Sequence, residues 1–299
     1  MQEFKPQRGR AADLSKLVYP VYVSTKVDGI RGNRINGLAR TKSLKPISNI
    51  YTRQLIEATP VLEGCEFELT TTWDFSDEEA FNKATGDFRR FEGQPSICMS
   101  IFDIYLPTTP FNERYAILRN LMLPDFARVL PQHLVTSRDQ LDEFIRIAAH
   151  LNHEGIMIRH HDSLYKCGMA TLKGGQLLKH KFLEDDEAVV IGVEEGTNNL
   201  NEKVTNELGR SKRSSAQEGL VPSGLAGVIL GQHPLWGVVR ISGLKDDLAK
   251  DMLINTSNYL GLLATFRYQS HGTMEAPRQA KFKGFRDPND MSLPETGEE

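Results

Sequence analysis

The chain of 299 residues is 25% charged and 39% hydrophobic, which are globular values, and its length suits one large or two ordinary domains. Its formal net charge of −3 excludes a protein coated in basic residues, and no apolar run of about eighteen residues is present to cross a membrane. The start of the chain lacks the apolar segment of a signal peptide. Cys65, Cys98 and Cys167 are odd in number and widely spaced, which argues against disulfides and a zinc site. We expect a protein of the cytoplasm, or of the host cytoplasm if the source is a virus, with no membrane partner.

Turn residues separate short apolar runs in the first part of the chain. These runs predict strands at 19–23, 65–69, 97–106 and 156–158. The spacing Ser76-Asp-Glu-Glu79 predicts a capping box that opens a polar helix ending near Gly86, and Ser137-Arg-Asp-Gln140 predicts a second helix start. The apolar face of this second helix contains Leu141, Phe144, Ile145 and Ala148. Because strands and helices do not alternate regularly, we expect an α+β fold and not a doubly wound one.

The pattern changes after residue 182. Strands are predicted at 188–193, 226–230, 236–241, 262–268 and 281–286, with one helix near 246–254. A long polar connection is expected from 194 to 223. Many strands with a single helix favour a small barrel of the OB type. We therefore predict two domains, 1–182 and 183–299.

The stretch Lys26-Val-Asp-Gly-Ile-Arg31 places a lysine at the end of an apolar run, directly before a turn. A free lysine has a pKa of about 10.4, so the neutral amine costs roughly 4.6 kcal/mol to reach at pH 7. Burial and nearby cations lower that cost because both disfavour the ammonium form. We expect Lys26 at the mouth of a buried strand and Arg31 on the facing strand of a hairpin. From these residues alone, an ordinary surface hairpin is an equal alternative.

Four further motifs follow in order: Glu66-Phe-Glu-Leu69, Phe102-Asp-Ile104, Glu154-Gly-Ile-Met-Ile-Arg159 and Leu178-Lys-His-Lys181. With the lysine stretch they make the chain resemble the covalent nucleotidyltransferase superfamily, and within it the ATP-dependent DNA ligases, especially the short phage-encoded type. The resemblance extends over nearly all of the chain. Phe67 stands where the family has a glycine. The resemblance implies a nucleotidyltransferase (adenylation) domain of mixed antiparallel sheets with helices at 1–182, followed by an OB-fold β-barrel domain.

The resemblance also implies roles for individual residues. Lys26 would attack the α-phosphate of ATP, forming a lysine–AMP phosphoramidate and releasing pyrophosphate. Glu68 and Glu154 would lie near Mg²⁺, for which Mn²⁺ is an alternative. The other implied ATP contacts are Thr25, Arg31, Phe102 (stacked on the adenine), Lys179, Lys181, Arg278 and Arg286. Taken singly, the aromatic could be plain core and the charged residues solvated, but a nucleophile, two carboxylates and two phosphate-binding cations form one coherent centre.

Two places are expected to contact DNA, and a motif of the OB domain is expected to act on ATP. Arg40 resembles an accessory arginine that grips the nicked strand near its 5′-phosphate. The segment Arg278-Gln-Ala-Lys281-Phe282 with Arg286 resembles a motif through which the OB domain closes over ATP, although Ala280 and Gly284 depart from it. Since no separate DNA-binding domain is expected before residue 1, we expect a flexible basic loop to bind the DNA duplex. Its cations are Arg210, Lys212 and Arg213, and a solvated loop without function is the alternative.

The resemblance therefore implies an ATP-dependent DNA ligase that seals 3′-hydroxyl/5′-phosphate nicks in duplex DNA during replication, repair or recombination. The expected intermediates are a lysyl-AMP and an adenylated 5′-phosphate. An RNA ligase or capping-type nucleotidyltransferase is a second hypothesis, which use of RNA ends or GTP would reveal. An inert OB-fold nucleic-acid binder is a third, and it would form no lysine adduct. We expect a monomer.

Overall fold

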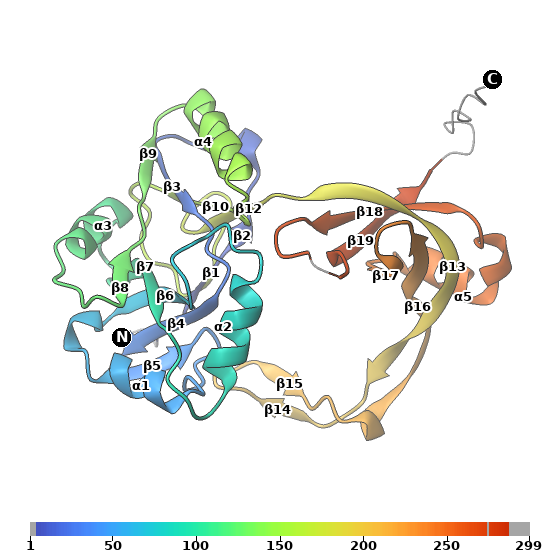
Figure 1. Ribbon diagram of the computed structural model, residues 1–299, viewed down its shortest axis with the longest axis horizontal. Coiled ribbons are helices and arrows are strands. Elements are labelled where there is room, and N and C mark those ends of the chain that lie inside the picture. The colour runs from blue at the N-terminus through green and yellow to red at the C-terminus, as the bar shows by residue number, and fades with distance from the viewer. Residues whose placement is uncertain (1–3, 274, 287–299) are drawn as a thin grey trace. The chain divides into compact units, whose positions relative to one another are not determined.

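The computed structural model of the chain describes residues 4–273 and 275–286 (Figure 1). The chain divides into two compact units. The first contains Met1–Phe182 and Asn206–Arg210, and the second contains Leu183–Thr205 and Ser211–Glu299. Asn206–Arg210, which falls inside the second predicted domain, is thus grouped with the first unit. The outermost parts of the two predicted domains, 1–3 and 287–299, lie outside the described residues.

One five-stranded sheet of the first unit has the order β2-β12-β10-β3-β9. Its strands are β2 (Arg10–Ala11), β3 (Val21–Thr25), β9 (His133–Val135), β10 (Gly155–His160) and β12 (Leu178–Lys181). Side chains alternate between the two faces of a strand. Val21, Val23, Ile156 and Ile158 therefore share a buried face, which packs against helix α4 (Arg138–His150). The opposite face of these strands remains available for a site.

A second five-stranded sheet has the order β5-β4-β6-β7-β8. Its strands are β4 (Ile30–Ile35), β5 (Leu38–Thr41), β6 (Cys65–Thr70), β7 (Cys98–Ile104) and β8 (Ala127–Val129). Helices α1 (Ile50–Glu57), α2 (Ala80–Arg89) and α3 (Phe111–Arg119) contribute Ile56, Phe88 and Leu118 to its buried core. A short parallel pair, β1 (Gln7–Arg8) with β11 (Gly168–Met169), and the 3₁₀ turns Leu14–Lys16 and Pro60–Leu62 complete the unit.

Phe67 is fully buried in the core of this second sheet, so the residue that departs from the family motif is accommodated by packing. Gly32 lies opposite it in the β4–β6 register. A Cβ atom on residue 32 would stand 2.4 Å from Phe67 Cε2, which is far inside van der Waals contact. The phenylalanine ring therefore occupies the space that the missing side chain of Gly32 leaves.

The second unit is a closed barrel with the strand order β13-β16-β17-β19-β18. The strands are β13 (Glu184–Asn199), β16 (Leu220–His233), β17 (Gly237–Ser242), β18 (Leu263–Gln269) and β19 (Arg278–Phe285). Helix α5 (Asp246–Ile254) spans the predicted range, and 3₁₀ turns lie at Gln217–Gly219 and Thr256–Asn258. Ile229, Ile241 and Phe266 are fully buried inside.

The polar connection predicted at 194–223 was largely wrong. Strand β13 continues to Asn199, and β14 (Lys203–Thr205) pairs with β15 (Ser211–Arg213) as an antiparallel hairpin. Residues of this ribbon are mostly exposed on both faces, so it needs no apolar alternation and gives no strand signal. Two of the three predicted loop cations, Lys212 and Arg213, therefore belong to a strand and not to an irregular loop.

The two predicted helix starts had opposite outcomes. Ser137 caps α4 as expected, because its hydroxyl accepts the backbone N–H of Gln140. The start at Ser76 was wrong: α2 begins at Ala80, after Glu79. Ser76 instead donates its hydroxyl and its backbone N–H to Asp74 Oδ1, at 2.6 and 2.9 Å, and so closes a turn ahead of the helix. Among the described residues, no helix combines the length and apolar character needed to cross a bilayer.

Candidate active site

Lys26 and Arg31 do not face each other across a hairpin, so that prediction was wrong. Strand β3, which ends just before Lys26, pairs with β9 and β10, whereas β4, which carries Arg31, pairs with β5 and β6. The chain therefore crosses from one sheet to the other at 26–29. Gly29 permits this crossing, because a Cβ atom there would meet the Leu69 carbonyl oxygen at 2.3 Å.

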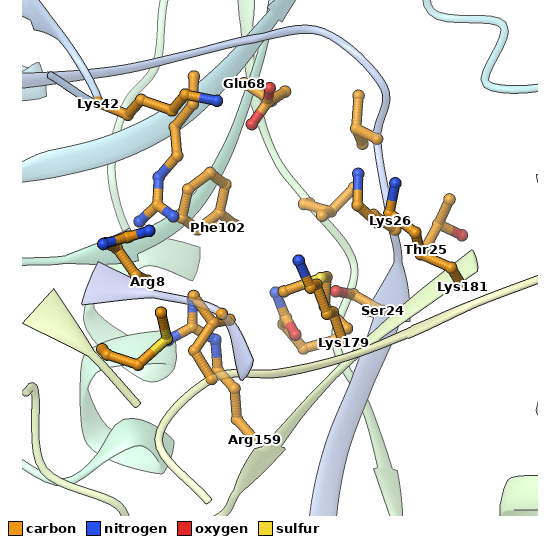
Figure 2. A pocket seen from close by; sticks show the side chains of 18 residues that line it. Arg8, Ser24, Thr25, Lys26, Lys42, Glu68, Phe102, Arg159, Lys179 and Lys181 are labelled. Atoms are coloured by element: carbon orange, nitrogen blue, oxygen red, sulfur yellow. The ribbon is translucent and has the colours of Figure 1, made fainter. Parts of the chain in front are cut away.

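The crossing places the two residues on different walls of one pocket of about 440 Å³ (Figure 2). The first sheet and the residue after β3 supply lysines to one wall, and the second sheet supplies a carboxylate and an aromatic ring to the other. Seven predicted site residues line this pocket: Thr25, Lys26, Arg31, Glu68, Phe102, Lys179 and Lys181. Residues from four separated stretches of the sequence thus meet as one chemical surface.

Glu154 holds two of the lysines together. It is 2% exposed, accepts a hydrogen bond from Lys26 Nζ, and forms an ion pair of 2.9 Å with Lys181 Nζ. Burial alone would raise the pKa of Glu154, but Lys26 and Lys181 outweigh it and the net pKa is lowered. The carboxylate is therefore ionised at neutral pH and fixes the amine of Lys26 at the pocket wall.

Lys179 is the third cation of this wall. It stands two residues from Lys181 on β12, so both side chains point to the same face of the sheet, as the alternation predicts. Burial lowers the pKa of Lys179, and the neighbouring Lys181 and Lys26 lower it further. Concentrated positive charge with a single buried counter-ion suits the binding of phosphate oxygens.

Glu68 lies on the opposite wall, directly across the β4–β6 ladder from Arg31. Burial raises the pKa of Glu68 to about 7, Lys26 and Arg31 oppose that shift, and Glu154 adds to it. Among the described residues, no hydrogen bond or ion pair engages its carboxylate. A partly buried carboxylate that faces a pocket without a partner suits a hard divalent cation, which prefers oxygen ligands.

Phe102 presents a ring to the same pocket, and charged groups hold it in place. The guanidinium carbons of Arg31 and Arg159 lie 5.0 and 5.8 Å from the ring centroid. Beside it the buried carboxylate of Asp103 accepts hydrogen bonds from Arg114 Nε at 2.8 Å and Arg159 Nη1 at 2.6 Å. Burial raises the pKa of Asp103, but the two arginines outweigh it and the net pKa is lowered. The ring is a rigid platform on which a planar base can stack.

Thr25 directly precedes Lys26, and its hydroxyl lies 3.1 Å from His153 Nδ1. His153 follows α4, and its backbone N–H donates to Ala148 at the helix end. The backbone N–H of Lys26 donates to the Gly155 carbonyl at 2.9 Å. These contacts attach the end of β3 to the start of β10, so the positions of Lys26 and Glu154 are set together.

The other predicted site residues lie elsewhere. Arg40 lines a separate pocket of about 380 Å³, next to Phe4 and Leu44. Arg210 and Lys212 are exposed, and Arg213 donates to the Asn201 carbonyl. In the second unit, Arg278 Nη1 donates to the His271 carbonyl at 3.1 Å, and Arg286 forms an ion pair of 2.9 Å with Glu187.

Sequence reasoning missed several residues that line the 440 Å³ pocket, among them Arg8, Ser24, Lys42, Gln132 and Met157. Alternation would have found two of them, because Ser24 and Met157 stand between buried residues of β3 and β10 and must face the other way. Arg8 and Gln132 come from short segments without a strong local pattern. Only the tertiary fold brings them to the site.

Comparison with known proteins agrees with this geometry. Residues 76–181 match the family model described as ATP dependent DNA ligase domain. Over these residues, which include Phe102, Glu154, Lys179 and Lys181, the chain is similar to that ligase domain. A DNA ligase of Thermococcus fumicolans is 32% identical over 171 residues, which are 52% of this chain and 29% of that protein. A second, from Thermococcus onnurineus, is 36% identical over 106 residues, 33% of this chain and 18% of that protein, so the chain spans well under half the length of these curated relatives.

Solved structures of ligases extend the likeness to the whole fold. The chlorella virus DNA ligase-adenylate has a TM-score of 0.53 at 23% identity, covering 96% of this chain and 99% of that one. A structure from a study of Lig E DNA ligases has a TM-score of 0.66 at 21% identity, covering 96% and 100%. The predicted resemblance to ATP-dependent DNA ligases and the predicted α+β fold with an OB-fold barrel are both confirmed.

Proposed function

We propose that the protein is an ATP-dependent DNA ligase that seals 3′-hydroxyl/5′-phosphate nicks in duplex DNA, in replication, repair or recombination. The observation that carries the proposal is the wall on which Glu154 joins Lys26 to Lys181 beside Lys179, opposite Glu68 and Phe102. This arrangement offers a nucleophilic amine, phosphate-binding cations and a base platform in one pocket.

In the first step the Lys26 amine loses a proton and attacks the α-phosphorus of ATP. A nitrogen–phosphorus bond forms, the bond to the pyrophosphate oxygen breaks, and pyrophosphate leaves. Lys179 and Lys181 stabilise the negative charge that develops on the phosphate oxygens. Phe102 stacks on the adenine, and Thr25 and Arg31 complete the ATP contacts.

Two transfers follow. A 5′-phosphate oxygen of the nicked strand attacks the AMP phosphorus, so the bond to Lys26 breaks and an adenylated 5′-phosphate forms. The 3′-hydroxyl then loses its proton and attacks the 5′-phosphorus, which forms the phosphodiester and releases AMP. Glu68 and Glu154 would hold Mg²⁺ or Mn²⁺, whose charge would neutralise the reacting phosphates. Within the part of the chain that the structure describes, the Glu68 carboxylate has no hydrogen-bond or ion-pair partner, which supports that role.

The DNA contacts in this proposal are Arg40 and the basic residues Arg210, Lys212 and Arg213. Nick sealing needs no sequence preference, so cations that meet backbone phosphates are sufficient. Arg278 and Arg286 of the barrel are proposed to serve the adenylation of Lys26. We further propose that the protein acts as a monomer in the cytoplasm. Its three free cysteines suit a reducing compartment.

The deciding experiment is incubation with α-labelled ATP and Mg²⁺, and in parallel with α-labelled GTP, followed by nicked duplex DNA. We expect one AMP per chain, no GMP, and transfer of the label to DNA with sealing. Labelling by GTP, or sealing of RNA ends only, would favour a capping-type enzyme or an RNA ligase. An absence of any covalent adduct would leave a nucleic-acid binder and refute the proposal.

A further inference from the structure

Gln132 lies at the pocket where the two sheets of the first unit are joined. It sits between β8 of the second sheet and β9 of the first. Two residues earlier, the Leu130 backbone N–H donates to the carbonyl of Ile101, the neighbour of Phe102, at 2.7 Å. One residue later, His133 pairs with Val23, next to Ser24. Gln132 is therefore placed beside both the aromatic platform and β3.

The carboxamide of Gln132 has no partner. The residue is 9% exposed and lines the pocket, and its backbone N–H donates to Tyr115 Oη at 3.0 Å. Among residues 4–273 and 275–286, nothing hydrogen-bonds its side-chain amide. The hydroxyl of neighbouring Ser24 likewise has no hydrogen-bond partner among the described residues. Ser24 is 2% exposed and also lines the pocket. Both side chains are largely buried while their polar ends open on the pocket, where a ligand can pair with them.

An amide offers one acceptor and two donors in a single plane. A base stacked on Phe102 presents only its edge to groups at the side of the ring. Adenine carries an amino donor at C6 next to a ring nitrogen that accepts, and a glutamine amide can pair with both at once. Guanine carries an acceptor at C6 instead. The order of donors and acceptors along the edge of the base therefore determines which orientation of the glutamine amide can pair with that base.

We propose that Gln132 reads the nucleobase of the nucleotide substrate, pairing its carboxamide with the 6-amino group and an adjacent ring nitrogen of adenine. This inference rests on the proposed function, because it concerns the base of the nucleotide that adenylates Lys26. Gln132 is a specificity residue and not a catalytic one, since it lies at the base and not at the reacting phosphate. The hydrogen bond from its backbone N–H to Tyr115 holds Gln132 at the pocket, although no described residue pairs with its side chain.

The experiment measures the rate of Lys26 labelling per unit nucleotide concentration with ATP and with purine riboside triphosphate, which has hydrogen in place of the 6-amino group. The unaltered protein should prefer ATP on the order of tenfold, as the loss of the one hydrogen bond from the 6-amino group predicts. Gln132→Met keeps the length but cannot pair. It should lower the rate with ATP, where two hydrogen bonds are lost, by more than the rate with the analogue, where only the bond to the ring nitrogen is lost, and so bring the ratio close to one.

Gln132→Glu provides a second, isosteric test. A carboxylate only accepts, so it should lose the pairing with the adenine ring nitrogen and gain pairing with the N–H and amino groups of guanine. The ratio of ATP to GTP labelling should therefore fall. Equal use of ATP and purine riboside triphosphate by the unaltered protein, or an unchanged ratio in Gln132→Met, would overturn the inference while Lys26 still labels. Absence of labelling with every nucleotide would instead contradict the proposed function.

Discussion

Oppositely charged side chains pair in both units, but burial gives the pairs different consequences. In the first unit Asp103 and Arg114 are both 0% exposed, and Arg159 joins them at 3%. On the barrel, Asp185 is 38% exposed and meets the exposed side chains of Arg267 and Lys283. Buried charges must be paired because desolvation is costly, whereas exposed pairs are screened by water and salt. The same residue types therefore fix an aromatic platform in one unit and contribute little in the other.

The largest effect is expected at the pocket lysine. Lys26→Ala should abolish the covalent AMP adduct, and Lys26→Arg should do the same because a guanidinium stays protonated at any working pH. Lys250→Ala, which alters an exposed lysine of the barrel helix, should label like the unaltered protein. Mass spectrometry of the labelled peptide checks this. Mapping of the adduct to any other lysine would contradict the assignment.

The buried ion pairs should dominate stability. Asp103→Asn leaves two buried arginines with one weaker acceptor and should destabilise the first unit by about 3–5 kcal/mol. Asp185→Asn removes an exposed partner and should lower the free energy of unfolding far less, because water and salt screen the pair. Urea unfolding, followed by signals assigned to each unit, measures both changes. Similar losses in the two variants would mean that burial does not separate the two regions.

A third effect concerns Arg210, Lys212 and Arg213, which form no ion pair with a carboxylate among the described residues, and of which the first two are exposed. Replacing Arg210, Lys212 and Arg213 together by alanine should weaken nicked-DNA binding and lower the magnitude of the log–log salt slope by up to about 3. Adenylation of Lys26 should remain at the parental rate. Binding titrations at several salt concentrations test this, with Lys250→Ala as the control. An unchanged slope and affinity would remove these residues from the DNA interface.

The smallest effect concerns Glu68, whose carboxylate has no partner among the described residues. The pKa of Glu68 is raised to about 7 in the folded state, against about 4.3 for an unfolded glutamate. Between these values the folded state binds more protons, so the contribution of Glu68 to stability falls as pH rises towards 7. Relative to Glu68→Gln, the melting temperature of the unaltered protein should drop by a few degrees between about pH 5 and 8. Parallel curves of melting temperature against pH for the unaltered protein and Glu68→Gln would contradict the raised pKa of Glu68. Glu218→Gln, which alters an exposed glutamate, is the control.

Local sequence patterns correctly predicted elements whose formation depends mainly on residues close together in the sequence. The apolar run at 65–69, the helix at 246–254 and the cap at Ser137 all correspond to elements of the structure. The lysine stretch predicted an interruption between two strands, but an interruption does not say whether the next strand returns to the same sheet. That choice depends on long-range pairing of β4 with β6 and of β3 with β10. Gln132 was not predicted as a site residue for the same reason, because its neighbours come from β3 and β7.

The contact of Gly32 with Phe67 constrains the order in which these two positions can change. Any side chain at residue 32 would place its Cβ atom 2.4 Å from the ring of Phe67. A phenylalanine can therefore enter at 67 only in a chain that already has glycine at 32. A return to a small residue at 67 would have to precede any enlargement at 32, and until then it would leave a cavity in the core of the sheet. A library that varies residue 32 alone should therefore lose the larger side chains, whereas a library that varies both residues together can recover them with a small residue at 67.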